Sequence, residues 1–406
     1  MKKGWEVKKL GELCTIKGRI GYRGYTKEDL VSKGEGAISL SPSNILGKDF
    51  ILDNCTYISW FKYDESPEIK IFNGDIIFVK TGSSYGKSAL VEELPEKATI
   101  NPQLVVFKNI NCINKYLYYA VNSVDFKDQV NKIIAGSAIP TLSQANLADL
   151  LISVPSKSEQ QRIVSVLDEA FASIAQAKSN AERNLVNARE LYEAVLQETF
   201  TGSKSEKWQT KKLEDVCSLV TDGKHGDSEN ESNSGYYFLS AKNIKDGTLS
   251  YDDAREITKK DFEETHRRTN LMPFDICMVN TGATIGKIAL APDDPKTFRT
   301  TFQKSVAIIK PISSIIDNAF CCYHLKSDLE KLLKVSSGSA QKNLLIGDMK
   351  NHLVRVPPLA EQRAIVGRLE ALSAETGRLE EIYQSKVEAL EELKKSVLAK
   401  AFEGEI

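Results

Sequence analysis

Two stretches of the chain carry the hydrophobic spacing of long amphipathic helices. Residues 158–200 and 360–402 contain no proline and few glycines. Along each stretch, apolar or small side chains recur at steps of mostly four and three residues, which is typical of a heptad seam. We predict two long helices that pair along these seams. The seam positions are Ile163, Leu167, Ala170, Ile174, Ala177, Ala181, Leu185, Ala188, Tyr192 and Val195, and then Ile365, Leu369, Leu372, Thr376, Leu379, Tyr383, Val387, Leu390 and Val397.

The remaining segments show a strand-like pattern. Short apolar runs, such as residues 75–79 and 104–107, alternate with glycine, asparagine, aspartate and proline. Such runs predict short strands joined by turns. We therefore expect an α+β protein with globular domains at residues 1–154 and 204–356 and helical segments at residues 155–203 and 357–406.

The same motifs occur twice, in the same order. Residues 75–90 and 275–290 share the pattern Asp-Ile-x-x-Val-x-Thr-Gly-x-x-x-Gly-Lys-x-Ala-Leu, and the Trp-x-x-Lys-Lys-Leu motif at Trp5 returns at Trp208. Two long copies indicate domain duplication and not a solenoid. Because each copy ends in a helix, antiparallel pairing within the chain predicts a pseudo-twofold molecule, with two tandem globular domains separated by an antiparallel coiled coil. An independent coiled-coil dimerisation element is the alternative.

Composition excludes few functions. The formal net charge of −1 over 406 residues gives no global signature of nucleic-acid binding, so any such contact must come from local patches. The seven cysteines and four histidines lack zinc-site spacing, and we expect no metal. The apolar runs are too short for a membrane span, and no secretory signal pattern follows the basic start, so we expect a cytoplasmic protein without membrane association.

The most prominent local motif is Thr81-Gly-Ser-Ser-Tyr-Gly-Lys-Ser88. It resembles a phosphate-binding loop, but three residues separate its glycines where a Walker A loop needs four. A tight loop with exposed hydroxyls and a lysine still suits DNA contact, with a purely structural hairpin as the alternative. The candidates here are Ser83, Ser84, Tyr85 and Lys87, with Thr284 and Lys287 in the second copy.

A second loop, residues 17–25, mixes glycines, cations and aromatics. Arg19 or Arg23 could bond guanine edges in a groove or contact phosphates, and Lys17 and Tyr22 are further candidates. The second-copy loop, residues 221–227, has different side chains, including Lys224 and His225. Equivalent loops with different chemistry predict two domains that read different sequences. A surface loop without function is the alternative. The repeated Leu-Ser-x-x-Asn-Ile motif adds Asn44, Lys242 and Asn243 as candidates.

No catalytic constellation is recognisable in the sequence. We find no Ser-His-Asp order, no cluster of paired carboxylates and no adenine-methylation motif. We therefore expect a protein that is not itself an enzyme.

The ordered, doubled motifs resemble specificity subunits of type I restriction-modification systems. The family pattern continues with Val154-Pro155 and Glu159-Gln-Gln-Arg-Ile-Val164, and with Val356-Pro357 and Glu361-Gln-Arg-Ala-Ile-Val366, so the resemblance covers essentially the whole chain. It implies two target-recognition domains that each read half of a split DNA site, and helices that set the unread gap. The first copy departs from the family's usual run after Gly136-Ser137, with Ala138-Ile-Pro-Thr, whereas Ser339, Gln341 and Lys342 of the second copy are candidates for DNA contact.

The resemblance also implies partners and cofactors. Two modification subunits would dock on the helices, for which the candidates are Gln160, Arg162, Ile163, Gln362, Arg363 and Ile365. These subunits would bring S-adenosylmethionine and methylate adenine after flipping the base. Restriction subunits would bring ATP-driven translocation with Mg and nuclease activity, and no cofactor is expected in this chain. A P-loop-like nucleotide hydrolase with a coiled-coil insertion, a coiled-coil scaffold and a methylation-only system are the alternatives.

Overall fold

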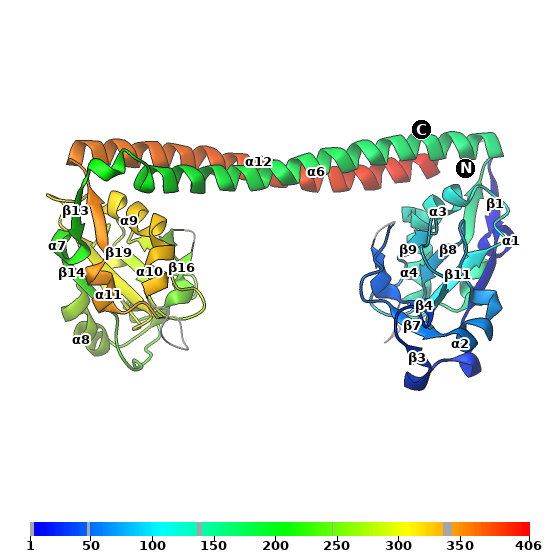
Figure 1. Cartoon of the computed structure of the whole chain (residues 1–406), viewed down its shortest axis with the longest axis horizontal. Coiled ribbons are helices and arrows are strands. Elements are labelled where there is room, and N and C mark those ends of the chain that lie inside the picture. The colour runs from blue at the N-terminus through cyan, green and yellow to red at the C-terminus, as the bar shows by residue number, and fades with distance from the viewer. Residues whose placement is uncertain (1–3, 47–48, 136–139, 246, 336–342) are drawn as a thin grey trace. The chain divides into compact units, whose positions relative to one another are not determined.

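The computed structural model describes residues 4–46, 49–135, 140–245, 247–335 and 343–406 (Figure 1). Contacts divide the chain into two compact units, residues 1–182 with 384–406 and residues 183–383. Each unit therefore contains one globular domain and one half of each long helix. No helix among the described residues has the length and apolar character needed to cross a membrane.

The two long helices are α6 (Lys157–Thr201) and α12 (Leu359–Glu403). In the first unit, the start of α6 packs with the end of α12, since Ile163 and Ala401 share one core and Lys178 forms an ion pair with Glu391. In the second unit, the end of α6 packs with the start of α12 in the same antiparallel sense. The predicted pair of long antiparallel helices is therefore confirmed, and each unit satisfies its own part of the seam.

Burial along the helices follows most of the predicted seam. Leu167, Ile174, Ala181 and Ala188 of α6 are buried, as are Leu369 and Thr376 of α12. Val195 is an error in the predicted seam because its side chain is 37% exposed. The next residue, Leu196, is buried instead, because the last turns of α6 pack into the core of the second domain.

Each globular domain is built on a four-stranded antiparallel sheet, which we call the main sheet. In the first domain its order is β2-β11-β8-β9, with β2 (Thr15–Gly18), β11 (Leu104–Lys108), β8 (Ile76–Val79) and β9 (Ser88–Leu90). In the second domain its order is β14-β22-β19-β20, with β14 (Cys217–Asp222), β22 (Val306–Pro311), β19 (Ile276–Val279) and β20 (Ile288–Leu290). The two copies thus share one topology.

The central strands of the main sheet are buried on both faces, which explains their continuous apolar sequence. Ile76 and Phe78 of β8 face a core formed with the helices, whereas Ile77 and Val79 face a second core. The second domain repeats this division of alternate residues. Its helix-side core contains Ile276 and Met278.

A second sheet covers the other face of each main sheet. In the first domain the order is β10-β4-β7-β3, with β10 (Ala98–Ile100), β4 (Gly36–Leu40), β7 (Thr56–Ser59) and β3 (Leu30–Val31), and β10 runs parallel to β4. In the second domain the order is β18-β15-β21, with β18 (Arg255–Glu256), β15 (Tyr237–Leu239) and β21 (Thr300–Phe302). Within the first unit, β3 and β7 lie at the end away from the long helices (Figure 1).

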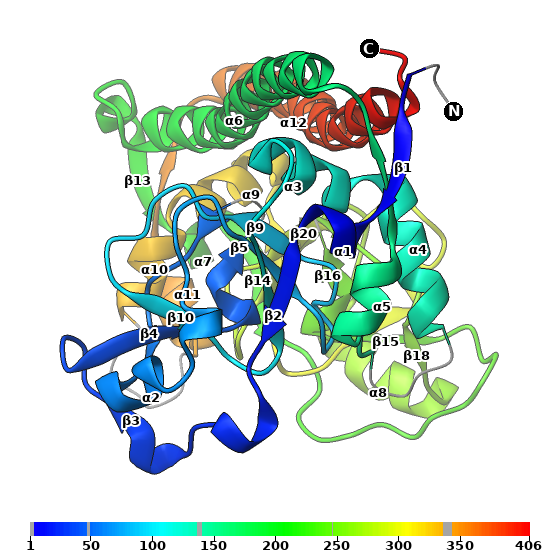
Figure 2. The ribbon, with the colours of Figure 1, turned by 90° about the vertical axis from the view of Figure 1, so that its right-hand side faces the viewer.

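Two-stranded sheets connect the domains to the helices. The pair β1 (Glu6–Lys9) and β12 (Leu151–Val154) leads into α6, and the pair β13 (Gln209–Lys212) and β23 (Leu353–Val356) leads into α12. Figure 2 shows β1 rising to the helix pair beside the C-terminus. Small hairpins complete the strands, with β5 (Ile45–Leu46), β6 (Asp49–Phe50), β16 (Ile244–Lys245) and β17 (Thr248–Leu249).

Short helices pack around the sheets. The first domain has α1 (Leu10–Leu13), α2 (Trp60–Asp64), α3 (Asn114–Asn122), α4 (Val124–Ile134) and α5 (Gln144–Asp149). The second domain has α7 (Leu213–Val216), α8 (Lys259–Thr269), α9 (Asn318–Ser327), α10 (Leu329–Val335) and α11 (Ile346–Asn351). The copies differ markedly at one of these helices, because α8 of the second domain has eleven residues where α2 of the first domain has five.

Candidate nucleic-acid interface

The strand registers bring the predicted motifs to one end of each main sheet. In the first domain Val105 pairs with Gly18 and Leu104 pairs with Val79. The loop that follows Gly18 and the hairpin that follows Val79 therefore start side by side. The second domain repeats this arrangement, with Ala307 opposite Asp222 and Val306 opposite Val279. We call this end of each main sheet the hairpin edge.

The motif Thr81 to Lys87 forms the turn between β8 and β9. Gly82 and Gly86 have φ angles of +98° and +81°, which a residue with a side chain rarely adopts, so both glycines are required by the turn. The Gly86 backbone N–H donates to the Val79 carbonyl at 3.0 Å and closes it. A strand follows the Gly-Lys pair, where a phosphate-binding loop would need a helix N-terminus. The geometry of this segment opposes the nucleotide hydrolase alternative.

A third segment joins the hairpin edge in both domains. The Gly82 N–H donates to the Pro140 carbonyl, and the Leu344 N–H donates to the Asn280 carbonyl. The Thr281 hydroxyl also donates to Asn343 Oδ1 at 2.7 Å. Pro140, Asn343 and Leu344, which come a few residues after the two Gly-Ser-Ala motifs, therefore pack beside the hairpins. Ser339, Gln341 and Lys342, which we predicted to contact DNA, lie outside the described residues.

The hairpin edge of the first domain contains a polar hollow of about 270 Å³. Most of its lining residues carry hydroxyl or amide groups, which can bond phosphate oxygens or base edges. The lining consists of Ser41, Pro42, Ser43, Thr81, Gly82, Ser83, Ser84 and Gln103. Sequence analysis identified Ser83 and Ser84 but missed Ser43, which lies in the 3-10 turn Pro42–Asn44, and Gln103, which lies in the turn before β11.

Exposed lysines supply positive charge at the hairpin edges. Lys87 and Lys287 occupy equivalent exposed positions, and the ion pairs formed by the described residues include neither. Lys242 is exposed on the turn Ala241–Asn243, where the first domain has Ser43. Thr284 is likewise exposed, and it occupies the position that Ser84 has in the first domain. The backbone frame is therefore shared between the domains while the presented side chains differ.

Two stretches of the chain, residues 2–183 and 205–389, match the family model described as type I restriction modification DNA specificity domain. The chain belongs to this family. Among its relatives, the EcoKI specificity subunit of Escherichia coli strain K12 is 23% identical over 99% of this chain and 89% of that protein. The MjaX protein of Methanocaldococcus jannaschii, a putative specificity subunit, is 23% identical over 99% of this chain and 93% of that protein.

Other relatives and solved structures agree. The EcoBI specificity subunit of Escherichia coli is 25% identical, and the match spans 72% of this chain and 65% of that protein. The HsdS subunit from Thermoanaerobacter tengcongensis superimposes with a TM-score of 0.63 at 18% identity, covering 100% of this chain and 98% of that one. A chain from a study of complex assembly and conformational transition of the type I R-M system superimposes with a TM-score of 0.75 at 19% identity. That match covers 99% of this chain and 98% of the other. The fold of this specificity-domain family is therefore shared.

The structure corrects our prediction for Arg19. Its side chain is only 6% exposed, and its guanidinium is bonded inside the first domain, so it does not face a DNA groove. Burial lowers the pKa of this guanidinium. Arg23, the other predicted base reader, is partly exposed and its Nη1 lies 3.5 Å from Glu68 Oε1.

Asn44 and Asn243 are also buried, contrary to our prediction of DNA contact. Each side-chain oxygen accepts the backbone N–H three residues earlier, at Ser41 and Ser240, and each amide donates to a carbonyl, at Ile51 and Ser250. They shape the turn after β4 and the turn after β15. The repeated Leu-Ser-x-x-Asn-Ile motif is therefore explained by structure.

Of the remaining loop candidates, Lys17, Tyr85, Lys224 and His225 are partly or fully exposed. Lys17 lies on β2, and the Tyr85 hydroxyl donates to Asn131 at 3.1 Å. Lys224 forms ion pairs with Asp261 and Glu264 at 3.4 and 3.2 Å. His225 is exposed beside Asp222, and Tyr22 lies in the 3-10 turn Gly21–Arg23.

Of the helix residues predicted to dock a partner, four are buried within this chain. Gln160 and Gln362 accept the backbone N–H groups of Ile113 and Asp317, which fixes each helix start to its own domain. Ile163 and Ile365 belong to the domain cores. For these four residues the prediction is corrected, because direct contact with a partner would require exposure. Arg162 and Arg363 remain exposed on the surface of the specificity-domain fold.

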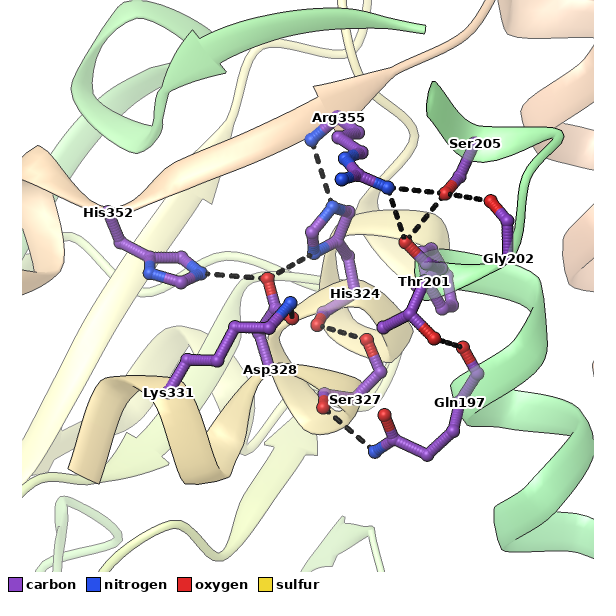
Figure 3. Close-up of polar contacts among 11 residues, drawn as sticks. Gln197, Thr201, Gly202, Ser205, His324, Ser327, Asp328, Lys331, His352 and Arg355 are labelled. Atoms are coloured by element: carbon purple, nitrogen blue, oxygen red, sulfur yellow. Dashed lines mark hydrogen bonds and ion pairs between the residues drawn. The ribbon is translucent and has the colours of Figure 1, made fainter. Parts of the chain in front are cut away.

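A polar cluster in the second domain was not found by sequence analysis (Figure 3). His324, Asp328 and His352 place potential ligand atoms within 4.8 Å of one another, beside a hollow of about 550 Å³. However, the Arg355 backbone N–H donates to His324 Nε2 at 2.9 Å, so the ring proton lies on Nδ1, the nitrogen that faces the cluster. Because a metal ligand must present a lone pair, this tautomer opposes a metal ion at His324.

The surroundings of the cluster shift the pKa values of two of its members. Burial lowers the pKa of His324 to about 4. Burial would raise the pKa of Asp328, but hydrogen bonds from His352 and Lys331 outweigh it and lower that pKa to about 2.

The cluster distinguishes the second domain from the first. The first domain has Ala120, Val124 and Leu150 at the corresponding positions. The specificity-domain fold therefore does not require a polar cluster at this place.

Proposed function

We propose that this chain is the non-catalytic, DNA-sequence-reading subunit of a type I restriction-modification enzyme. The observation that supports it best is the doubled hairpin edge, with one backbone frame and two different sets of side chains. A duplicated frame with a lysine at the same position of each copy, Lys87 and Lys287, suits phosphate contacts that position each domain. The divergent Ser43 and Lys242 suit recognition of two different half-sites in one asymmetric DNA site.

The partners follow from the same proposal. Double-stranded DNA is the ligand, and two modification subunits dock on the helix pair, near Arg162 and Arg363. The modification subunits supply S-adenosylmethionine and methylate adenine, and restriction subunits supply ATP- and Mg-dependent translocation and cleavage. The EcoKI and MjaX relatives, whose names describe specificity subunits, support this assignment.

The decisive experiment maps methylated adenines in a host that expresses the modification subunits with or without this chain. A single split motif, present only with the chain, is the expected result. Its two halves should change separately when the hairpin-edge residues of one domain are exchanged. The same methylation in the host that lacks this chain, or a methylated motif that is not split, would overturn the proposal.

A further inference from the structure

Two equivalent loops start at the hairpin edges and cross to the second sheets. One runs from β2 to β3, residues 19–29, and the other runs from β14 to β15, residues 223–236. Both loops contain candidates for DNA contact, Arg23 in the first and His225 in the second. Loops of this length lose conformational freedom when they bind, unless the protein already holds them in one shape.

In the first domain, Arg19 holds its loop from inside. Its Nε donates to the Ile100 carbonyl at 3.1 Å, and its Nη2 donates to the Thr99 hydroxyl at 3.3 Å. Its Nη1 donates to the Arg23 carbonyl at 3.3 Å, and the guanidinium lies 5.2 Å from the ring centre of Tyr25. One side chain therefore ties both Arg23 and Tyr25 to strand β10.

In the second domain, Arg255 holds the loop from a neighbouring strand. Its Nη1 donates to Asp227 at 2.8 Å, its Nη2 donates to the Ser228 carbonyl at 2.9 Å, and its Nε donates to Asn230 at 2.9 Å. The guanidinium also lies 5.4 Å from the ring centre of Phe238 on β15. The loop thus wraps around one fixed cation.

The two arginines occupy different positions of the duplicated fold. The strand registers place Gly223 where the first domain has Arg19. A Cβ at Gly223 would lie 2.1 Å from the Phe302 carbonyl oxygen, so no side chain fits there. Conversely, β18 carries Arg255 where β7 carries Thr56. Each domain therefore has an arginine that braces this loop from a different position of the fold, although duplication alone would have left both arginines at matching positions.

We propose that Arg19 and Arg255 are positioning residues that fix the DNA-contacting loops of the first and second domain. Neither arginine acts on DNA itself, because the internal contacts occupy its guanidinium. Each brace instead pre-organises its own loop, so its loss weakens discrimination at one half-site only. The inference rests on the proposed function and names residues that determine its specificity.

The test uses the complex of the full chain with its modification subunits. Binding is measured on the cognate DNA and on duplexes with one substituted base pair in either half-site. The variant R255Q should lower discrimination at the second half-site roughly tenfold, leave the first half-site unchanged and preserve the salt slope. R19K keeps the charge, but its compact ammonium group cannot reach the three separated acceptors that the planar guanidinium bonds. It should give the mirror result at the first half-site.

A second variant guards against a folding defect. N230A removes an acceptor of the Arg255 guanidinium from the exposed loop and leaves the core intact, so it should reproduce the R255Q selectivity. Equal losses on both half-sites, or a salt slope lowered by about one in R255Q, would overturn the positioning role. If the complex with the wild-type chain shows no preference for any sequence, the proposed function fails instead. This outcome separates the two conclusions.

Discussion

His324 accepts a hydrogen bond from the backbone N–H of Arg355 at 2.9 Å, and this contact satisfies the outer edge of strand β23. The first domain satisfies the corresponding edge differently, because the Tyr116 hydroxyl donates to the Ser153 carbonyl at 2.6 Å. Only a neutral histidine can accept through Nε2, since a protonated ring carries hydrogen on both nitrogens. The second domain therefore depends on an uncharged His324.

We predict that the second domain loses stability in mild acid. The pKa of His324 is about 4 in the folded protein, against 6.5 for an unperturbed histidine, so the unfolded chain takes up the proton first. Stability is therefore complete above about pH 6.5 and falls as the pH drops towards 4, by about 3 kcal/mol in all. Asp328 adds a further loss only below its unperturbed pKa of 3.8.

Trp208 offers a direct measurement, because its ring packs 5.9 Å from Phe320 in the core of the second domain. Denaturant unfolding followed by Trp208 fluorescence, with Trp5 and Trp60 replaced by Phe, should show the loss between pH 7.5 and pH 5. H324Q keeps an acceptor near the position of Nε2 without a titrating group, so it should flatten this profile. H225A, at an exposed histidine, is the matched control. A profile unchanged by H324Q would refute the prediction.

Lys87 and Lys287 should each contact one phosphate. Replacement of either lysine by alanine should then weaken DNA binding on every sequence and lower the slope of log K against log salt by about one. Filter binding of the assembled complex between low and physiological salt measures both quantities. K395A, which removes an exposed lysine from α12, should leave the slope unchanged. A loss confined to one sequence would assign the lysine to base recognition.

Local periodicity explains why the helices and hairpins were predictable. The heptad seam of α6 and the glycines of the 81–87 turn depend on neighbours in sequence, and both appear where the pattern placed them. Val195 was assigned to the seam wrongly because Leu196 and Phe200 pack against a domain core that the helix pattern does not contain.

Burial of polar side chains was not predictable, because it depends on distant segments. Arg19 was predicted to be a surface cation. It is buried because strand β10, some eighty residues later in the chain, provides Thr99 and Ile100 as acceptors for its guanidinium. Gln160 was assigned to partner docking, but it bonds the backbone before α3. The cluster of His324, Asp328 and His352 unites separate segments and has no spacing signature.

The helices should set the distance between half-sites. Removing one heptad from each, residues 180–186 and 383–389, keeps the seam in register and shortens each helix by about 10 Å. Both deletions lie between the ion pair of Lys178 with Glu391 and that of Arg189 with Glu380. The methylated motif should keep both half-sequences and change only its gap. Altered half-sequences with an unchanged gap would show that the helices are not the spacer.

The duplication predicts that the first copy alone forms a dimer. A fragment of residues 1–203 lacks α12, so it exposes the seam of α6 and the core surface that Phe402 covers beside Tyr116. Exposed apolar surface costs about 25 cal/mol per Å², which favours antiparallel pairing of two fragments. Phe200 occupies the position in its copy that Phe402 occupies in the other, and it packs against Phe320 in the full chain. In the dimer, Phe200 of a second fragment should replace Phe402.

Sedimentation should therefore find a dimer of the 1–203 fragment at micromolar concentration, and F200A should shift it towards monomer. V186A, at an exposed position of α6, is the matched control and should leave the dimer intact. With modification subunits added, the dimer carries two copies of the first domain, so it should direct methylation to an inverted repeat of the first half-site. A monomeric fragment, or methylation of the asymmetric site by it, would contradict pairing of the two copies through their helices, because only a second copy of the seam can cover the surface that α12 leaves.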